Sequence, residues 1–198
     1  MNDGTQVHLR LVRPDDKKLL EQGLARMSPE SRYFRFFSAK DRLTHAELAY
    51  LTELDGENHL AIGAARYLED GTELGLGIAR FIRLRERPEV AEAAITVIDE
   101  AQGLGLGKLL LTMLVLAARE RGITRFQCDF LARNKGMHTL IERIADDVRY
   151  GHESGVMQAE FALEGPEGLY RALAGVARKE GHVRPGSGLP KLETTNDS

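Results

Sequence analysis

The sequence predicts an α/β domain built on a mixed β-sheet. Three consecutive segments have the composition of strands: "HLAIGAARYLE", "LGLGIARFIRL" and "AEAAITVID". The turn "EDGTE" joins the first two, so we expect an antiparallel meander. A strand, a helix and another strand follow, and this crossover adds a parallel neighbour to the sheet.

The length of the chain favours one domain. Its 198 residues, of which 42% are hydrophobic, are enough to bury one core and few for two, so we expect a domain over residues 1–164. From Gly165 the composition shifts. "GPEGLYRALAGVARKEG" predicts an amphipathic helix and "HVRPGSGLPKLETTNDS" a disordered tail, which together form a C-terminal segment over 165–198. The apolar stripe of that helix could pack on its own domain, cover a binding pocket or join a second copy in a homo-oligomer.

Local signals define the other elements of the first half. "VHLRLVRPDD" alternates apolar and polar residues and breaks at Pro14, which predicts a first strand. "KKLLEQGLARM" carries leucines at helical spacing and predicts a helix. "THAELAYLTEL" predicts a second helix, in which Thr44 and Glu47 form a capping box.

The second half alternates helices and strands. A leucine-rich helix begins after the glycines of "QGLGLGK", runs to about Glu120 and closes at Gly122. The strand "TRFQCDFLA", a short helix from about Gly136 to Ile144 and the strand "VMQAEFALE" come next.

Composition argues against several classes of function. The formal charge of −3 gives no general attraction to nucleic acid or to an anionic membrane, and no apolar run is long enough to span a bilayer. The start, "MNDGTQVHLR", lacks the pattern of a secretion signal. The lone Cys128 can form no internal disulfide, which fits a reducing cytoplasm, and in "FQCDF" it is most simply a core residue. The six histidines lack the spacing of metal ligands, so we expect no metal site.

The glycine-rich segment "QGLGLGK" lies where a strand turns into a helix. A Walker loop would need glycine at Gln102 and a hydroxyl residue at Leu109, and neither is present. The dinucleotide fingerprint would need glycine at Lys108. A turn without a ligand remains an alternative, although a turn or cap requires only one glycine.

Three glycines on alternate positions point to a ligand that approaches the backbone. Unpaired N–H groups and the partial positive charge at the start of the following helix suit a pyrophosphate. The local charge agrees, because residues 102–143 contain seven Lys or Arg and three Asp or Glu.

The order strand, Gln-x-x-Gly-x-Gly, helix, strand, Asn134 resembles the acetyl-CoA-binding core of the GNAT superfamily of N-acetyltransferases. "LRLVRPDD", "MSPESRYFRFFS" and "LAYLTELDGENHLAIGAA" are similar to the catalytic domain of Pat-type protein lysine acetyltransferases, and the resemblance covers about residues 7–163. It implies the GNAT fold, a twisted mixed sheet of six or seven strands with helices on both faces.

The resemblance also implies a binding site for acetyl-CoA. The amides of the glycine loop would hold its pyrophosphate, and the backbone at the end of the preceding strand would pair with its pantetheine arm. Asn134 matches the family's asparagine beside the cofactor, while a turn former in "RNKG" is the alternative. The implied cofactor-binding residues are Ile95, Thr96, Val97, Gln102, Gly103, Leu104, Gly105, Leu106, Gly107, Lys108 and Asn134.

Acetyl transfer to an amine needs a neutral nucleophile. A lysine-type amine with a pKa of about 10.4 is neutral in roughly one molecule in two thousand at about pH 7, so a base is useful. Glu92 matches the family's strand glutamate that serves as this base, directly or through water; an ordinary polar strand residue is the alternative. Partial burial brings a carboxylate closer to the range suited to base catalysis, so we expect Glu92 to be partly buried. Asp99 is the second candidate, although it suits a turn or cap equally well.

The family's acid, a tyrosine seven residues after the asparagine, is replaced by Ile141. Either the thiolate leaves without a side-chain acid or another donor serves. His138 is one turn earlier on the same helix, but a surface histidine is the simpler interpretation.

The function implied by the resemblance is acetyl-CoA-dependent N-acetylation, with a protein lysine as the leading acceptor. A small amine such as a polyamine, amino acid or aminoglycoside is the alternative acceptor. A non-catalytic acetyl-CoA sensor that regulates a partner is the alternative of another class.

Overall fold

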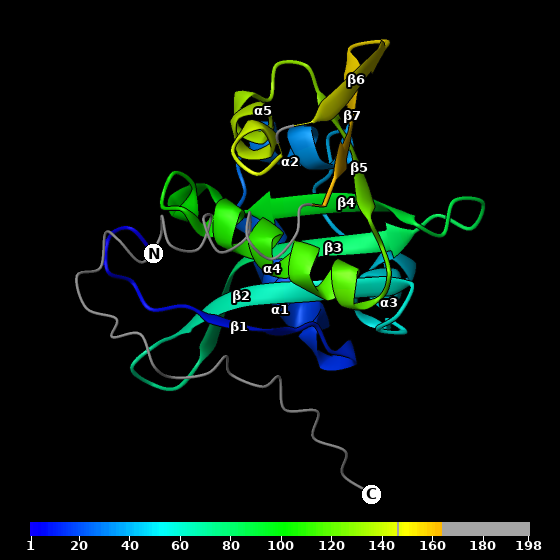
Figure 1. Cartoon of the computed structure of the whole chain (residues 1–198). Coiled ribbons are helices and arrows are strands. Elements are labelled where there is room, and N and C mark those ends of the chain that lie inside the picture. Colours follow the sequence, from blue (N-terminus) through cyan, green and yellow to red (C-terminus); the bar gives the residue numbers. More distant parts are fainter. Residues whose placement is uncertain (146, 164–198) are drawn as a thin grey trace, which may run out of the picture.

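The computed structural model of the chain describes residues 1–145 and 147–163. Its strands form one seven-stranded sheet in the order β1-β2-β3-β4-β5-β7-β6 (Figure 1). The strands are β1 (His8–Leu11), β2 (His59–Tyr67), β3 (Glu73–Arg83), β4 (Val90–Val97), β5 (Arg125–Leu131), β6 (Val148–Glu153) and β7 (Val156–Ala162). The α-helices are α1 (Lys17–Ala25), α2 (Pro29–Phe36), α3 (His45–Thr52), α4 (Leu106–Glu120) and α5 (Lys135–Glu142), and short 3₁₀ turns cover η1 (Pro14–Asp16) and η2 (Asp99–Ala101).

The one parallel pair in the described sheet is β4 with β5, and it is short. The two strands pair from Val90 with Arg125 to Glu92 with Gln127, over three residue pairs. Beyond Glu92 they separate, and β4 runs across the sheet while β5 leaves it at a steep angle (Figure 1). The other edge of β4 stays paired with β3 as far as Val97. One edge of β4 over residues 93–97 therefore has no neighbouring strand.

Helix α4 packs its leucine-rich face on the sheet. Leu106, Leu110, Leu111 and Leu114 are all at most 1% exposed. The approach to β3 is close, because a Cβ at Gly77 would lie 3.0 Å from Leu110 Cδ1. Figure 1 shows α4 across the near face of the sheet and α1 and α3 behind it, so helices cover both faces.

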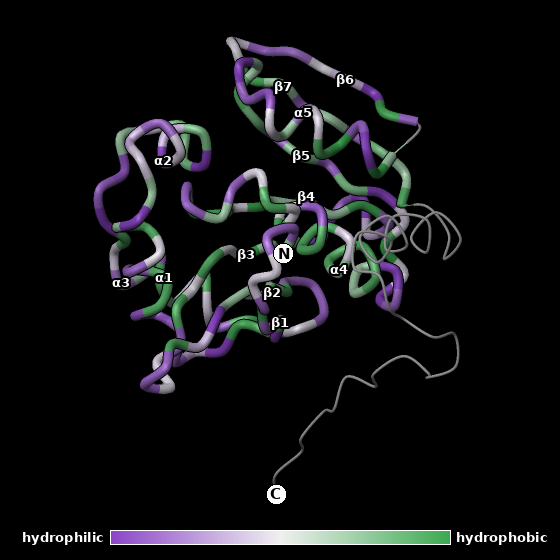
Figure 2. Tube along the Cα trace, turned by 90° about the vertical axis from the view of Figure 1, so that its left-hand side faces the viewer, coloured by the Kyte–Doolittle hydropathy of each residue, from purple (hydrophilic) through white to green (hydrophobic). Residues whose placement is uncertain are grey.

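The separation of β4 and β5 divides the molecule into two groups of elements. In the turned view, α1 and α3 lie beside β1–β3, and α5 lies with β5, β6 and β7 (Figure 2), while α2 contacts β5. Apolar segments run along the strands and α4 between the two groups (Figure 2). The opening between the groups is where a ligand could reach the edge of β4.

Most of the predicted elements are confirmed, including the capping box, in which Thr44 Oγ1 accepts from Glu47 N and Glu47 Oε2 accepts from Thr44 N. Gly122 has a φ of 74°, as expected after a helix end. The number of strands, given as six or seven, is seven in the described chain. The predicted C-terminal helix and tail over 165–198 lie outside the described residues.

Two elements had not been predicted. Helix α2 was not predicted, and none of its residues is fully buried, so no buried face marks it in the sequence. It begins locally, with Pro29 in the first turn and the Ser28 hydroxyl accepting from Ser31 N at 3.1 Å. Strand β6 was missed because it lies at the sheet edge and is exposed over nearly its whole length, so no alternation marks it.

A partly buried ion-pair cluster joins β1 to the turn η1 and to β3. Arg10 Nη1 and Nη2 lie 2.7 and 2.8 Å from the two carboxylate oxygens of Asp16, and Arg10 Nη2 lies 2.7 Å from Glu73 Oε2. The Asp16 side chain is 11% exposed. Burial raises the pKa of Asp16, but hydrogen bonds from Arg10 and from Arg13 N outweigh it and leave the pKa lowered. The carboxylate form of Asp16 therefore stabilises the fold.

We predict that Asp16→Asn lowers the free energy of unfolding by about 2 kcal/mol, because it leaves part of Arg10 without a counterion in a partly buried site. A lowered pKa means that the contribution of Asp16 is present above its ordinary value of 3.8 and is lost as the pH falls through the folded-state value. Urea denaturation at about pH 7 and about pH 3 measures both effects. Lys17→Gln, which removes an exposed pair with Glu53, should cost less than about 0.5 kcal/mol. Equal losses in the two variants would contradict the prediction.

Candidate active site

A cleft of about 740 Å³ lies where β4 and β5 separate. Its floor is the unpaired part of β4, from Ala93 to Val97. The loop before α4 and the start of that helix form one wall, residues of α2 form another, and the segment around α5 closes the far side. The loop follows β4 directly in the chain, whereas α2 and the segment around α5 are distant in sequence, and the cleft opens where the parallel pairing ends at Glu92.

The three positions of the loop that carry glycine differ in whether the structure requires glycine there. Gly103 and Gly105 have φ angles of 73° and 86°, a region that favours glycine, and Gly105 is the N-cap of α4. Gly107 lies inside the first turn with no positive φ, and a Cβ there would be 3.7 Å from Leu140 Cδ2. Neither backbone conformation nor packing requires glycine at that position. Gly107 also lines the cleft, so it fits a ligand that approaches the helix backbone.

The first amides of α4 are free to bind an anion. The first hydrogen bond of the helix runs from Leu109 N to Gly105 O at 3.1 Å, so the N–H groups of residues 106–108 have no partner within the helix. The Lys108, Lys135 and Arg143 side chains also line this cleft. None of the three forms an ion pair in the part of the chain that the structure describes. A phosphate-containing ligand would be stabilised here by the free amides of α4, by the dipole of that helix and by the lysines that line the cleft.

Most of the predicted cofactor-binding residues come together in this cleft. Those that line it are Ile95, Thr96, Val97, Gln102, Gly103, Gly105, Gly107, Lys108 and Asn134. Leu104 and Leu106 do not line it. Leu106 is 1% exposed in the core, and Leu104 O accepts a hydrogen bond from Asn2 N at 3.0 Å. The prediction for these two residues concerned their backbone amides, and for them it stays a prediction.

Two of the cleft residues also hold the local structure. Asn134 Oδ1 accepts from Met137 N at 3.1 Å and caps α5, which is the turn-forming role considered from the sequence. Gln102 Nε2 donates to Val97 O at 3.0 Å and to Ser31 Oγ at 3.2 Å. Gln102 therefore ties the loop to the end of β4 and to α2.

The candidate base Glu92 lies at the closed end of the cleft. It belongs to the last residue pair between β4 and β5, next to Ala93, which lines the cleft. Its side chain is exposed, so the expectation of partial burial is wrong. Glu92 has a strand on each side, with Ile82 and Gln127 as its partners, but its side chain projects from the face of the sheet and its exposure shows that no described element covers it there.

The second candidate, Asp99, acts as a structural anchor. Its carboxylate accepts from Ser28 N at 2.8 Å and from Ser31 Oγ at 3.0 Å, which fixes the start of α2 against the end of β4. Burial raises the pKa of Asp99, but the hydrogen bonds from Ser28 and Ser31 outweigh it and lower the pKa. A carboxylate with occupied oxygens and a lowered pKa is a poor base at neutral pH.

The other candidates lie outside the cleft. Ile141 is fully buried in the core, so no side-chain acid is found at the family's tyrosine position. The His138 ring packs edge-on against Phe130 at 4.8 Å and beside Tyr150 at 5.9 Å, and it does not line the cleft. Cys128 is fully buried, and burial raises its pKa, which fits an inert core thiol.

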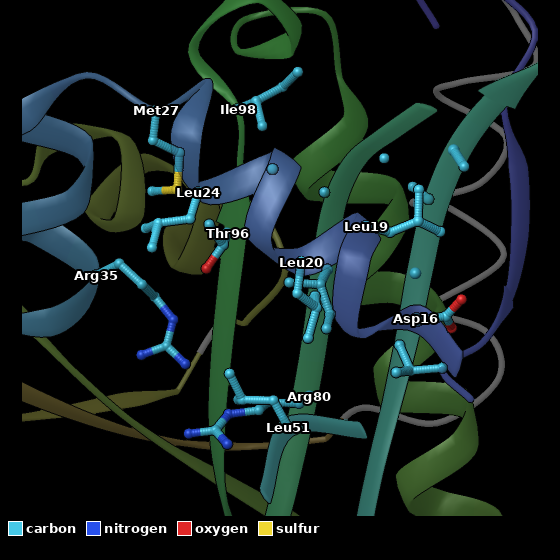
Figure 3. A pocket seen from close by; sticks show the side chains of 18 of the residues that line it. Asp16, Leu19, Leu20, Leu24, Met27, Arg35, Leu51, Arg80, Thr96 and Ile98 are labelled. Carbon is cyan, nitrogen blue, oxygen red and sulfur yellow. The ribbon is translucent and has the colours of Figure 1, made fainter. Parts of the chain in front are cut away.

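A smaller cavity of about 110 Å³ adjoins the cleft between the sheet and α1, α2 and α3. It is largely apolar, and Leu19, Leu20, Leu24 and Leu51 are among the side chains that line it (Figure 3). The cavity and the cleft share four residues: Met27, Arg35, Ala94 and Thr96. A molecule in the cavity would therefore meet a molecule in the cleft beside the middle of β4. No sequence pattern indicates this cavity, because no single segment forms it.

Neither a metal site nor a membrane span is found among the described residues. Within 1–145 and 147–163, no group of three or more His, Cys, Asp or Glu side chains is placed to hold a metal ion. Over the same residues, no helix has the length and apolar character needed to cross a bilayer.

Comparisons with known proteins place the chain among acetyltransferases. The acetyltransferase (GNAT) family model matches residues 17–145. An acetyltransferase of Pseudomonas aeruginosa is 32% identical over 140 residues, covering 71% of this chain and 74% of the relative. The acetyltransferase Pat of Mycolicibacterium smegmatis is 34% identical over 145 residues, covering 71% of this chain and 41% of the relative. The chain thus matches less than half the length of the second relative.

Solved structures agree with these relatives. The GNAT domain of S. lividans PAT has a TM-score of 0.72 and 28% identity, covering 81% of this chain and 93% of that chain. A cAMP-binding acyltransferase from Mycobacterium smegmatis has a TM-score of 0.57 and 27% identity, covering 89% of this chain and 53% of that chain.

We predict that Asp99→Ala lowers the free energy of unfolding by about 1–2 kcal/mol, because Ser28 N and Ser31 Oγ lose their acceptor. Urea denaturation provides the measurement. The control is Asp15→Ala, which removes an exposed acid whose side chain has no hydrogen bond in the described chain and should change stability by less than about 0.5 kcal/mol. If Asp99→Ala unfolds with the wild-type free energy, the hydrogen bonds of Asp99 do not contribute to stability and the prediction is wrong.

Proposed function

The chain belongs to the GNAT family of acetyltransferases, and from this premise we propose that it transfers acetyl from acetyl-CoA to the side-chain amine of a protein lysine. N-acetyltransferase activity follows from the family. The identity of the donor, the acceptor and the residue roles is the proposal. Its main support is the cleft at the separation of β4 and β5, where an unpaired strand edge and a helix N-terminus face one cavity.

The cleft suits the two chemical parts of acetyl-CoA. The pantetheine arm carries amide groups, and the unpaired edge of β4 at residues 93–97 offers backbone groups for them, as another strand would. The pyrophosphate would lie on the amides of residues 103–108, and Lys108 adds charge there. We infer that the acetyl group then lies near Ala93 and Ala94, beside Glu92.

In this proposal Glu92 takes the proton from the acceptor amine. Because Glu92 is exposed and does not line the cleft directly, a water molecule carries the proton between the amine and the carboxylate. The nitrogen then bonds to the acetyl carbon, and the carbon–sulfur bond breaks. We propose that the sulfur leaves as a thiolate without a side-chain acid. A thiol with an ordinary pKa of about 8.5 is already a reasonable leaving group.

The candidate acceptors are favoured by different observations. A protein lysine is favoured by the similarity to the relatives named Pat. A small amine is the second candidate, because the apolar cavity of about 110 Å³ next to the cleft has room for a few atoms only. A sensor that binds acetyl-CoA without transferring acetyl is the candidate of another class.

Mass spectrometry distinguishes these candidates. The purified chain is incubated with acetyl-CoA and either a protein mixture or a set of polyamines, amino acids and aminoglycosides. Acetylated lysines above the enzyme-free background support the main proposal. Acetylated small amines alone support the second candidate. Binding of acetyl-CoA without any transfer would contradict the proposed activity.

Three further expectations are part of the proposal. We propose that residues 1–164 form the GNAT domain and 165–198 a separate segment; the family match at 17–145 lies inside the first range. Association into a homo-oligomer remains a prediction that depends on that segment. A cytoplasmic location remains a prediction from the single cysteine of the chain.

We predict that Glu92→Gln lowers turnover by about 10²–10⁴, because it keeps the shape of the side chain and removes the proton acceptor. The dissociation constant for acetyl-CoA should change by less than about twofold, since Glu92 does not line the cleft. Steady-state kinetics and calorimetry measure the two quantities. Glu86→Gln, at an exposed glutamate in the loop between β3 and β4, is the matched control and should keep wild-type turnover. If the turnover of Glu92→Gln stays within a few-fold of the wild-type value, Glu92 is excluded as the general base.

We predict that Gly107→Glu weakens acetyl-CoA binding on the order of 100-fold, about 2.7 kcal/mol, by placing bulk and negative charge at the amides. The fold should not be weakened, because glutamate is a better helix residue than glycine by roughly 0.5–1 kcal/mol and suits the first turn. Calorimetry and thermal melting separate these effects. Gly151→Glu, on β6 outside the cleft, should leave binding unchanged. A folded Gly107→Glu that binds normally would remove the loop from the site.

A further inference from the structure

Two guanidinium groups project into the region where the apolar cavity opens into the cleft. Arg35 comes from α2 and Arg80 from β3, and Figure 3 shows both side chains pointing into the cavity. Arg80 is paired with Ala94 in the sheet register, so it lies beside the part of β4 that forms the cleft floor. Arg35 and Ala94 line both spaces.

Neither arginine has a counterion within residues 1–145 and 147–163. Arg80 Nε and Nη1 are buried without a hydrogen-bond partner. Arg35 forms neither a hydrogen bond nor an ion pair within the described residues, and its group lies over the Phe36 ring at 5.3 Å. Arg80 lies over the Tyr50 ring, also at 5.3 Å. Aromatic faces hold the two groups in place but leave their N–H donors unused.

The nearby acids do not neutralise this pair. Asp16 and Glu73 line the same cavity, but Arg10 binds both of them. Glu92 is close enough to act on Arg35 through its charge, but it makes no ion pair with it. Burial, and then the charge of Arg80, lowers the pKa of Arg35 to about 10, which fits a cation that lacks a sufficient counterion.

Placing two cations together in a partly apolar site without a partner is unfavourable for folding. An arginine can avoid this cost by extending its charged end into water. That explanation accounts for Arg80 only in part, because its Nη2 is not among the buried nitrogens while Nε and Nη1 are buried without a partner in the described residues. A planar carboxylate matches the donors of guanidinium groups and would satisfy both residues at once.

We propose that Arg35 and Arg80 bind a carboxylate that the acceptor carries close to the amine that becomes acetylated. This inference rests on the proposed function, and it names the chemical class of the acceptor. Residues 92 and 94 are on the same face of β4, about 7 Å apart along the strand. An acceptor with its amine near Glu92 and its carboxylate opposite Ala94 thus holds the two groups about 7 Å apart in space. The carboxylate belongs either to a free amino acid or to an acidic residue beside the acceptor lysine of a protein.

The test compares acceptors that differ only in the carboxylate. One pair consists of blocked peptides with lysine next to glutamate or next to glutamine. The other pair consists of a free amino acid and its C-terminal amide. The assay uses the full chain and acetyl-CoA. The acidic member of at least one pair should have a KM lower by about tenfold or more, because hydrogen bonds between the arginines and a charged carboxylate strengthen binding by at least that factor. The pair that shows the preference identifies the source of the carboxylate.

Variants then connect the preference to the two arginines. Arg35→Met and Arg80→Met should each reduce the ratio of the KM of the neutral acceptor to that of the acidic acceptor to about threefold or less. The KM of the neutral acceptor should change little. Arg149→Met, at an exposed arginine on β6 outside both cavities, should keep the preference. The melting temperature of Arg80→Met should not fall, because an unpaired buried charge is removed. If Arg80→Met does not fold, Arg80→Lys replaces it, since lysine keeps the charge but loses the planar set of donors.

A binding measurement separates this inference from the proposed function. Calorimetry with glutarate, a dicarboxylate without an amine, should show binding to wild type and none to Arg80→Met. If no amine is acetylated but glutarate binds in this way, the proposed activity fails and the carboxylate site stands. If transfer occurs with equal KM for both members of each pair, or if Arg80→Met keeps the preference, the carboxylate site is overturned.

Discussion

The short parallel pairing between β4 and β5 is the constraint on which the rest of the site depends. Three residue pairs hold the two strands together, and the next residues of β4 have a partner on one side only. The separation exposes a strand edge, opens the cleft beside the N-terminus of α4 and leaves Glu92 at its closed end. Gln102 and Asp99 preserve this opening, because their side chains fasten the loop and α2 to the end of β4. The cleft thus lies where one edge of β4 lacks a neighbouring strand in the described sheet.

Charge is distributed unevenly around this opening. Lys108, Lys135 and Arg143 line the cleft, and Lys108 lies in the first turn of α4, where free helix amides suit phosphate groups. Arg35 and Arg80 lie at the other end, between the cleft and the apolar cavity. Two separate positive regions along one channel fit a donor that is anionic at its far end and an acceptor that is anionic near its reacting group. The formal charge of the whole chain is −3, so the net charge does not indicate either positive region.

The sequence predicts those features that depend on local signals. Strand alternation, the Thr44 capping box and the glycine loop are encoded by residues close together in the chain, and the structure has all three. The features it could not predict need contacts between distant segments. The anchoring of Ser28 by Asp99 and the meeting of Arg35 with Arg80 depend on how α2 lies over the sheet. The exposure of Glu92 was mispredicted for a related reason, since the burial of a strand side chain depends on which distant element packs on its face of the sheet.

The buried thiol of Cys128 gives the protein an internal reporter of its own opening. It is the only cysteine in the chain, it lies on β5 and it is fully buried. An alkylating reagent reacts with a thiolate in contact with solvent, so labelling requires β5 to be uncovered first. The rate of alkylation therefore measures how often the sheet opens beside the cleft. A ligand that bridges β4 and the segment after β5 would slow that reaction, although it never touches the sulfur.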